Sequence, residues 1–168
     1  MTLKNAAAAF TSVLALAACG NQSPTTPPDQ GEVVPNVAGV YSNDAMWLTQ
    51  FNRVYDGYRG SWICSGSLTL VQAPGTPSFT GFAVVGAPCS ALSFELGGAV
   101  RPGGAVYFTT GGPKPEAGPC VSTMPLTTYV GTLTENNRTL SVRSTKRLFC
   151  QGEGDYEFTQ IITAYKRF

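Results

Sequence analysis

Residues 58–72 read YRGSWICSGSLTLVQ and carry the longest strand pattern in the chain. The apolar residues of one parity in this stretch are Trp62, Cys64, Leu68 and Leu70. Serine and threonine fill most of the positions between them, and successive side chains of a β-strand point to opposite faces. The alternation therefore predicts a strand with one buried face. Asp56-Gly57, just before it, is typical of a tight β-hairpin turn.

Similar period-two patterns continue on both sides of this stretch. They predict strands at residues 37–42, 45–55, 58–72, 79–85, 92–96, 105–109, 126–134, 138–150 and 156–168. Asn43-Asp44 is expected to form a turn between the first two, and Asn136-Asn137 a two-residue hairpin turn further on. The segment 111–119, with three prolines and three glycines, is the longest expected irregular connection.

This succession of short strands, with no helical pattern after residue 36, indicates an all-β fold. We expect an antiparallel up-and-down barrel of about eight strands, because a meander of this size matches small closed barrels. Closure also removes the sheet edges that would otherwise aggregate. A two-sheet β-sandwich is the alternative.

The amino-terminal segment, residues 1–18, has the pattern of a secretory signal peptide. Lys4 provides a basic start, and residues 6–18 are apolar or small apart from Thr11 and Ser12. This apolar run is too short to span a bilayer, which needs roughly 20 apolar residues. We therefore expect residues 1–18 to be removed on export.

The stretch Leu16-Ala17-Ala18-Cys19 resembles the lipobox of bacterial lipoproteins at every position. The resemblance implies that the Cys19 thiol receives a diacylglycerol and that its new amine is acylated after cleavage. Several acyl chains give stable membrane anchoring, whereas one does not. Gly20 in place of Asp favours the outer membrane in Gram-negative relatives of this pattern, if the host has one. The alternative is an ordinary secreted protein in which Cys19 is a disulfide partner.

Residues 19–36 form the next segment, rich in Pro, Ser, Thr and Gln. Such a segment buries too little apolar surface to offset the entropy of ordering it, so we expect a disordered tether. Residues 37–168 are then expected to form a single all-β domain in the cell envelope.

The charge composition excludes a nucleic-acid partner. The chain has 11 basic and 10 acidic side chains, and Lys4 is the only charge in the expected signal peptide. The remaining charges balance, whereas nucleic-acid binding needs a basic surface. Charged residues make up only 12% of the chain. The surface must therefore consist largely of uncharged polar residues.

Four of the five cysteines remain if Cys19 is lipidated. An even number in an exported chain predicts two disulfides, and four cysteines allow three pairings. We favour Cys64 with Cys89 and Cys120 with Cys150, because sequential strands usually pair in space. A zinc site is not expected, since the chain has no histidine and no Cys-x-x-Cys pair.

Gly60-Ser61-Trp62 resembles the Gly-x-Trp that lipocalins and avidins carry on their first strand. The resemblance implies a ligand-holding barrel in which a basic residue of the last strand, here Lys166 or Arg167, packs over that Trp. The sequence departs from the family in one respect, because Gly60-Ser61-Trp62 falls on the third expected strand. Gly39-Val40-Tyr41 has the expected position but carries Tyr.

No catalytic motif or cofactor-binding motif is present, and we do not expect an enzyme. The lack of histidine excludes Ser-His and Cys-His nucleophiles. Gly-x-Ser-x-Gly, P-loop and dinucleotide glycine patterns are also missing. A carboxylate-dependent hydrolase is the least favoured alternative. Its candidate residues are Asp44, Asp56, Glu95, Glu116, Glu135, Glu153, Asp155 and Glu157.

Basic residues gather in the expected strand 138–150, where Arg143, Lys146 and Arg147 precede a group of acidic residues at 153–157. Cross-strand charge pairing is the favoured explanation. An anion-binding site is the alternative.

Aromatic residues crowd into the neighbouring strands around the Asp56-Gly57 turn. They are Trp47, Phe51, Tyr55, Tyr58 and Trp62. Such residues either line the mouth of a barrel and bind an apolar or ring-bearing molecule, or fill its core. We expect a lipid-anchored barrel that binds a small apolar ligand. The alternative is a solid barrel with a structural role, or one that contacts an envelope protein or polysaccharide.

Overall fold

The computed structural model describes residues 33–89, 91–111, 120–122, 126–134 and 136–168, with the backbone alone described for 120–122. The strands are β1 (Gly39–Arg53), β2 (Arg59–Gln72), β3 (Ser78–Val85), β4 (Leu92–Val100), β5 (Ala105–Gly111), β6 (Cys120–Ser122), β7 (Leu126–Thr134), β8 (Thr139–Cys150) and β9 (Gly154–Lys166). A single 3-10 turn, Pro102–Gly104, is the helical element of this described part. None of its residues belong to a helix long and apolar enough to cross a bilayer.

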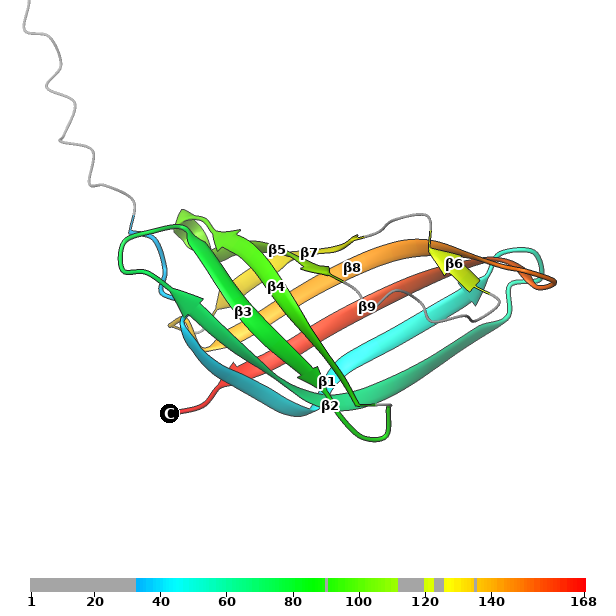
Figure 1. Ribbon diagram of the computed structural model, residues 1–168, viewed down its shortest axis with the longest axis horizontal. Coiled ribbons are helices and arrows are strands. Elements are labelled where there is room, and N and C mark those ends of the chain that lie inside the picture. The colour runs from blue at the N-terminus through cyan, green and yellow to red at the C-terminus, as the bar shows by residue number, and fades with distance from the viewer. Residues whose placement is uncertain (1–32, 90, 112–119, 123–125, 135) are drawn as a thin grey trace, which may run out of the picture. The chain divides into compact units, whose positions relative to one another are not determined.

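The strands form one closed antiparallel barrel (Figure 1). Neighbours follow the chain from β1 to β5, then β7, β8 and β9, and β9 pairs back with β1. Within the described residues the barrel therefore has eight strands in up-and-down order, which confirms the predicted fold class and rejects the sandwich. β6 lies outside this circuit and pairs with the end of β8.

The predicted turn at Asn43-Asp44 is wrong, because β1 runs straight through it. The register of β1 shifts between Asn43 and Trp47 against β2 and between Ser42 and Trp47 against β9, which is a β-bulge. The Asn43 amide donates to the Thr163 carbonyl at 3.2 Å, and its oxygen accepts from the Ala45 N–H. The Asn43 side chain thus forms hydrogen bonds with backbone groups at the bulge, where the regular pairing between strands is interrupted. Because two expected strands merge, Trp62 lies on the second strand rather than the third.

Two further boundaries differ from expectation. β4 continues to Val100, four residues beyond the expected end at Leu96, where the small residues Gly97 and Gly98 obscure the alternation. β6 was not predicted, because three residues are too few to show a period. Most of the expected connection 111–119 lies outside the described residues, as do the expected signal peptide and most of the tether.

The turn predictions at the two hairpins are confirmed. Asn136 and Asn137 have φ values of 56° and 67°, the left-handed pair that a tight hairpin turn requires. Gly57 has a φ of 70° and donates its N–H to the Arg53 carbonyl at 2.8 Å. The side chain of Asp56 accepts from the Tyr58 N–H at 3.0 Å, which fixes the loop between β1 and β2.

Side chains fill the interior of the barrel. Its largest fully buried members are Tyr41, Phe108, Met46, Leu68, Leu140 and Ile162. Trp47, with 4% of its surface exposed, lies edge-on to Phe94 and Tyr129 at 5.6 and 6.2 Å between ring centroids. Phe108 stacks on Tyr129 at 5.0 Å. Each such buried side chain contributes about 1.5–3 kcal/mol.

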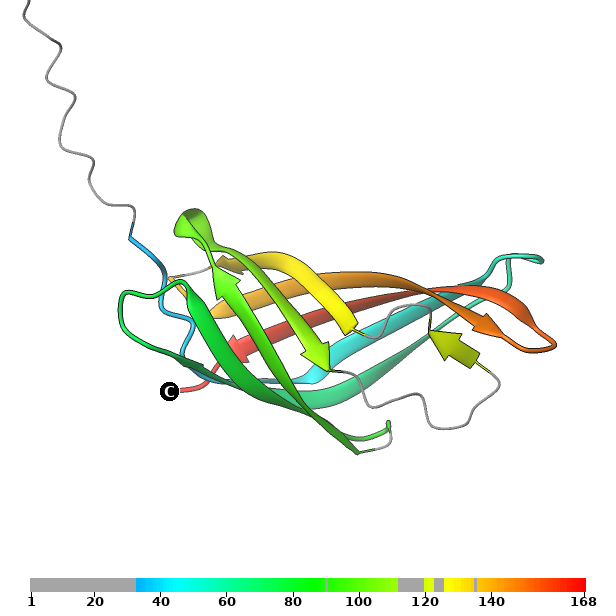
Figure 2. The same cartoon turned by 45° about the horizontal axis from the view of Figure 1, so that its top comes forward.

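Four adjacent strands are longer than the other four. β2, β1, β9 and β8 have 14, 15, 13 and 12 residues, against 7 to 9 for β3, β4, β5 and β7. The long strands therefore continue past the closed barrel as a curved four-stranded sheet (Figure 2). We call this part the hairpin end, because it carries the β1–β2 and β8–β9 turns.

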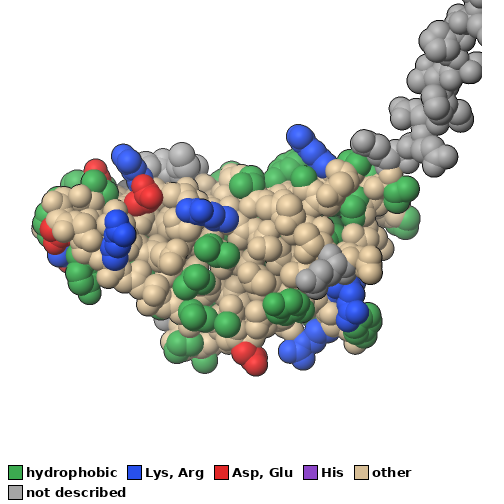
Figure 3. Space-filling view, turned by 180° about the vertical axis from the view of Figure 1, so that it is seen from behind, with side chains coloured by type: hydrophobic (Ala, Val, Ile, Leu, Met, Phe, Trp, Pro, Cys, Tyr) green, Lys and Arg blue, Asp and Glu red, His purple; other side chains and the backbone are tan. Residues whose placement is uncertain are grey.

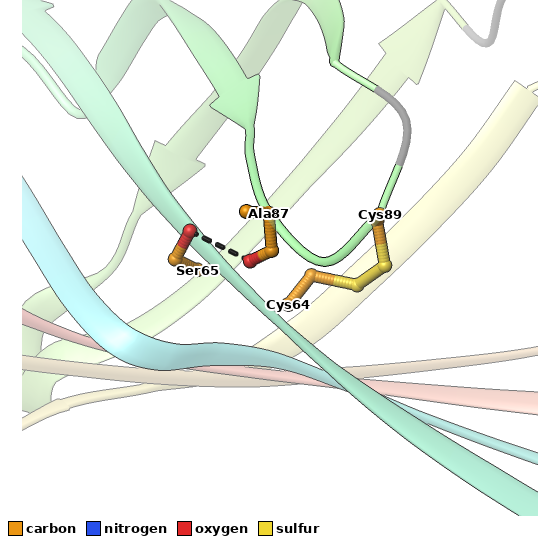
Figure 4. Close-up of a disulfide and its surroundings, with 4 residues drawn as sticks. All are labelled: Cys64, Ser65, Ala87 and Cys89. Carbon is orange, nitrogen blue, oxygen red and sulfur yellow. Dashed lines mark hydrogen bonds between the residues drawn. A yellow bond between two sulfur atoms is a disulfide. The ribbon is translucent and has the colours of Figure 1, made fainter.

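The Cys64–Cys89 disulfide joins β2 to the β3–β4 loop, as predicted (Figure 4). β2 and β3 stop pairing at Gly66 and Val85, and the bond lies just beyond that point. Backbone hydrogen bonds of 2.9 Å join Ser65 to Ala87 and to Gly86, and the Ser65 hydroxyl donates to the Ala87 carbonyl. The loop is thus fastened to β2 at Cys64, which stands opposite Trp47 on β1.

The second predicted disulfide involves Cys150, which is disulfide-bonded. Cys120 on β6 stands opposite Cys150 in the backbone register. The pairing of these two side chains stays a prediction, since that of Cys120 lies outside the described part.

Replacing Cys64 and Cys89 together with alanine is expected to lower the free energy of unfolding by about 3 kcal/mol, because the bond closes a loop of 25 residues. Urea unfolding of the oxidised protein measures the change. The same variant under reducing conditions provides the control. Equal stability of variant and parent in both conditions would contradict a structural role for the bond.

Candidate binding site: an aromatic face at the hairpin end

Backbone register brings residues from four strands into one row on the inner face of the hairpin end. Phe51 on β1 stands opposite Gly60 on β2 and Phe158 on β9. Lys146 on β8 stands opposite Phe158 from the other side. On each strand, the position in this row lies an even number of residues from positions whose side chains fill the barrel core. The four residues therefore face the hollow of the sheet rather than its outer surface.

Five aromatic residues meet on this surface, which we call the aromatic face: Phe51, Tyr58, Trp62, Tyr156 and Phe158. The Phe51 ring is central, with centroid distances of 5.8 Å to Tyr58, 5.7 Å to Trp62, 6.1 Å to Tyr156 and 6.0 Å to Phe158. Such ring pairs each contribute about 0.5–1.5 kcal/mol beyond the area they bury. Trp62 and Tyr58 nonetheless keep 41% and 57% of their surface exposed. The face is thus ordered by its own contacts and open to solvent.

Gly60 makes room for the central ring. A Cβ added there would lie 2.4 Å from two carbons of the Phe51 ring. The ring therefore lies directly against the β2 backbone, at the only residue type that permits this approach. Gly60-Ser61-Trp62 thus supplies both the space for Phe51 and one of its partners.

A polar layer separates the aromatic face from the barrel core. Thr49 stands opposite Trp62 and Gln160, and Ser144 stands opposite Gln160 on the other side. Thr49 and Ser144 are buried. The Tyr129 hydroxyl donates to the Gln160 side-chain oxygen at 2.7 Å. Below this layer the apolar core begins with Trp47.

The structure divides the five aromatic residues that the sequence singled out. Phe51, Tyr58 and Trp62 lie together on the aromatic face. Trp47 belongs to the core, on the far side of the polar layer. Tyr55 is 65% exposed in the β1–β2 turn, where the Arg53 guanidinium lies 4.9 Å from its ring centroid.

Sequence reasoning missed Tyr156 and Phe158, and it grouped Lys146 with Arg143 and Arg147 rather than with the aromatic residues. Tyr156 and Phe158 have the parity of the buried residues Ile162 and Ala164, so the alternation of the last strand carried the signal. Their proximity to Phe51 required the pairing of the first and last strands, which follows only from closure.

The ionised groups at the β1–β2 turn are paired with each other. Arg53 forms an ion pair with Asp56, and its Nε donates to the carboxylate at 2.9 Å. This hydrogen bond and that from the Tyr58 N–H hold the pKa of Asp56 below its usual value. Across the face, the Tyr156 hydroxyl donates to Glu153 at 2.6 Å, which raises the pKa of Tyr156.

Lys146 lies half-buried on the same face, and burial lowers the pKa of its ammonium group. No ion pair joins it to a carboxylate among the described residues. Its neighbour Arg147 stands opposite Glu157 in the backbone register of the outer surface, where the expected cross-strand charge pairing stays a prediction. The basic cluster of the sequence is therefore divided between the two faces of β8.

The outer surface of the same strands has a polar groove. Its lining includes Gln50, Asn52, Arg59, Ser61, Glu157 and Thr159. The Asn52 side-chain oxygen is buried there without a hydrogen-bond partner in the described part of the protein. A groove of this composition can bind hydroxyl-rich molecules through amide and carboxylate groups.

Four of the six described candidate carboxylates, Asp56, Glu153, Asp155 and Glu157, lie at the hairpin end, and Asp44 and Glu95 lie elsewhere. Asp44, Asp56, Glu95, Glu153 and Asp155 are exposed, and Glu157 is half-buried. Glu116 and Glu135 lie outside the described residues. Within the part that the structure describes, no three Cys, Asp or Glu side chains gather as metal ligands would.

The basic residue that the barrel resemblance places on the last strand contacts Tyr41 rather than Trp62. Lys166 stands opposite Tyr41 on β1, with its Nζ 6.0 Å from the centre of the tyrosine ring. Gly39 leaves space for the lysine stem, since a Cβ there would lie 2.6 Å from its Cε. Burial raises the pKa of Tyr41 to about 12.

No protein-family model, curated protein sequence or solved structure matches this chain.

Replacing Gly60 with alanine is expected to displace the Phe51 ring and lower the free energy of unfolding by about 1–3 kcal/mol, as overpacking does. Tryptophan fluorescence and near-ultraviolet circular dichroism, to which Trp62 contributes, report the change. Gly97→Ala is the matched control, because a Cβ there meets nothing within 4 Å. Identical spectra for Gly60→Ala and the parent would contradict the close packing of Phe51 on β2.

Proposed function

We propose that this protein is a lipid-anchored barrel of the cell envelope that binds a small, flat, apolar or ring-bearing molecule on its aromatic face. The observation that carries the proposal is the exposed aromatic face itself. Large aromatic surfaces left open beside a filled core are typical of interaction sites. The ligand would lie on the inner surface of the hairpin end, since side chains already occupy the barrel interior.

The attachment of the amino-terminal segment supports this arrangement. The Val37 N–H donates to the Gln72 side chain at 2.7 Å, and that side chain donates to the Pro35 carbonyl at 3.2 Å. These bonds hold the incoming chain at the end of the barrel opposite the hairpin end (Figure 1). The residues through which an anchor at Cys19 would join the domain are therefore attached away from the aromatic face.

The surface composition supports an exported protein. Uncharged polar side chains and backbone cover most of the face in Figure 3, and charged side chains are few. The whole sequence, with 11 basic and 10 acidic side chains, has nearly balanced charge and thus gives no strong net attraction to anionic lipid or nucleic acid. Recognition would therefore depend on local contacts at the aromatic face rather than on the overall charge.

A second candidate is a solid barrel that binds an envelope protein or polysaccharide on its outer surface. The polar lining of the groove favours it, because the amide, hydroxyl and carboxylate groups there can hydrogen-bond a hydroxyl-rich partner. Failure of the aromatic face to bind a ring-bearing probe would shift the assignment to this candidate.

N-phenyl-1-naphthylamine, an uncharged dye that fluoresces outside water, tests the aromatic face. We expect it to bind the parent protein and to bind Trp62→Ala about fivefold or more weakly, because the variant loses an exposed ring of the face. Tyr107→Ala is the control, since Tyr107 is similarly exposed at 43% but lies on β5, outside the hairpin end. Equal dye affinity in the parent and Trp62→Ala would reject binding at this face.

The lipid anchor has its own test. In a host that processes lipoproteins, Cys19→Ser is expected to move the protein from the membrane fraction to the soluble fraction, since the acyl chains supply the binding energy. Mass spectrometry of the processed parent protein should show the mass of the acyl groups on Cys19. An unmodified Cys19 joined to another cysteine would reject the anchor without affecting the dye result.

A further inference from the structure

We infer that the ligand of the aromatic face is a ring-bearing organic acid whose anionic group is bound by Lys146. This inference rests on the proposed function and specifies the chemistry of its ligand. The aromatic face by itself would accept any flat apolar body. The lysine beside it adds a requirement for negative charge on one side of that body.

The position of Lys146 supports this assignment. It stands opposite Phe158, which stands opposite Phe51, so the residue lies on the β8 side of the central rings. Its parity is that of Ser144 and Val142, both of which are buried inside the barrel. A molecule lying on Phe158 and Phe51 would therefore have one edge next to the lysine.

The nearby acidic groups are occupied elsewhere. Asp56 is paired with Arg53, and Glu153 accepts the hydrogen bond of Tyr156. Asp155 and Glu157 alternate with the aromatic residues of β9 and thus face the outer surface. Among the described residues, the inner face therefore offers Lys146 no carboxylate that is not already engaged.

A half-buried ammonium group without a counter-ion is unfavourable. Apolar surroundings penalise its charge, which is why the pKa of Lys146 is lowered. An anion on a bound molecule would restore the missing interaction, and charged hydrogen bonds are stronger than neutral ones. The apolar rings would supply contact area, and the acid would set the orientation of the ligand.

Two related dyes separate the apolar contribution from the ionic one. 8-Anilinonaphthalene-1-sulfonate carries a sulfonate on the ring system of N-phenyl-1-naphthylamine. In Lys146→Gln we expect the sulfonate dye to bind about tenfold or more weakly, while the uncharged dye binds as to the parent. Arg147→Gln is the matched control, because it removes the same charge from the next residue on the opposite face of β8.

The binding of the two dyes to the two variants decides whether Lys146 binds the anionic group. Selective loss of sulfonate binding in Lys146→Gln, with both dyes unchanged in Arg147→Gln, supports the inference. Equal effects of the two variants, or an equal effect of Lys146→Gln on both dyes, overturns it. In that case the proposed function survives if Trp62→Ala still weakens the uncharged dye. Urea unfolding of each variant verifies that the fold is intact.

Discussion

β9 pairs along both of its edges, with β1 on one side and β8 on the other, and the rest of the structure depends on these two ladders. They turn a meander into a closed barrel. The first strand, β1, and the last strand, β9, therefore pair with each other instead of forming two open edges. The two ladders also bring residues from opposite ends of the sequence into single rows. Phe51 and Phe158 are neighbours for this reason alone, and so are Tyr41 and Lys166.

The unequal strand lengths then determine which inward-facing side chains stay exposed. Where all eight strands are present, facing side chains meet and fill the interior, as in other small barrels. Where only the four long strands continue, β3, β4, β5 and β7 no longer stand across from them, and among the described residues only the short β6 pairs at the β8 edge. The same alternation that buries Trp47 and Ile162 therefore exposes Trp62 and Tyr58 a few residues further on. The aromatic face is the continuation of the core beyond the closed barrel.

Two kinds of local feature keep this arrangement in register. The bulge between Asn43 and Trp47 adjusts β1 against both neighbours, so that its apolar residues face inward on either side of it. The Cys64–Cys89 bond holds the β3–β4 loop where the short strands end. Gly60 positions a single side chain, because its lack of a Cβ lets the Phe51 ring lie on the β2 backbone.

The sequence by itself determined what depends on neighbouring residues. Alternation predicted the strands, Asp56-Gly57 and Asn136-Asn137 predicted their turns, and sequential pairing predicted the Cys64–Cys89 bond. It also drew attention to Phe51, Tyr58 and Trp62, which lie close together along the chain. Tertiary structure alone decided that Trp47 joins the core, that Asn43-Asp44 is a bulge, and that Phe158 and Lys146 complete the face. These depend on register between strands distant in sequence, which closure of the barrel sets and local patterns do not encode.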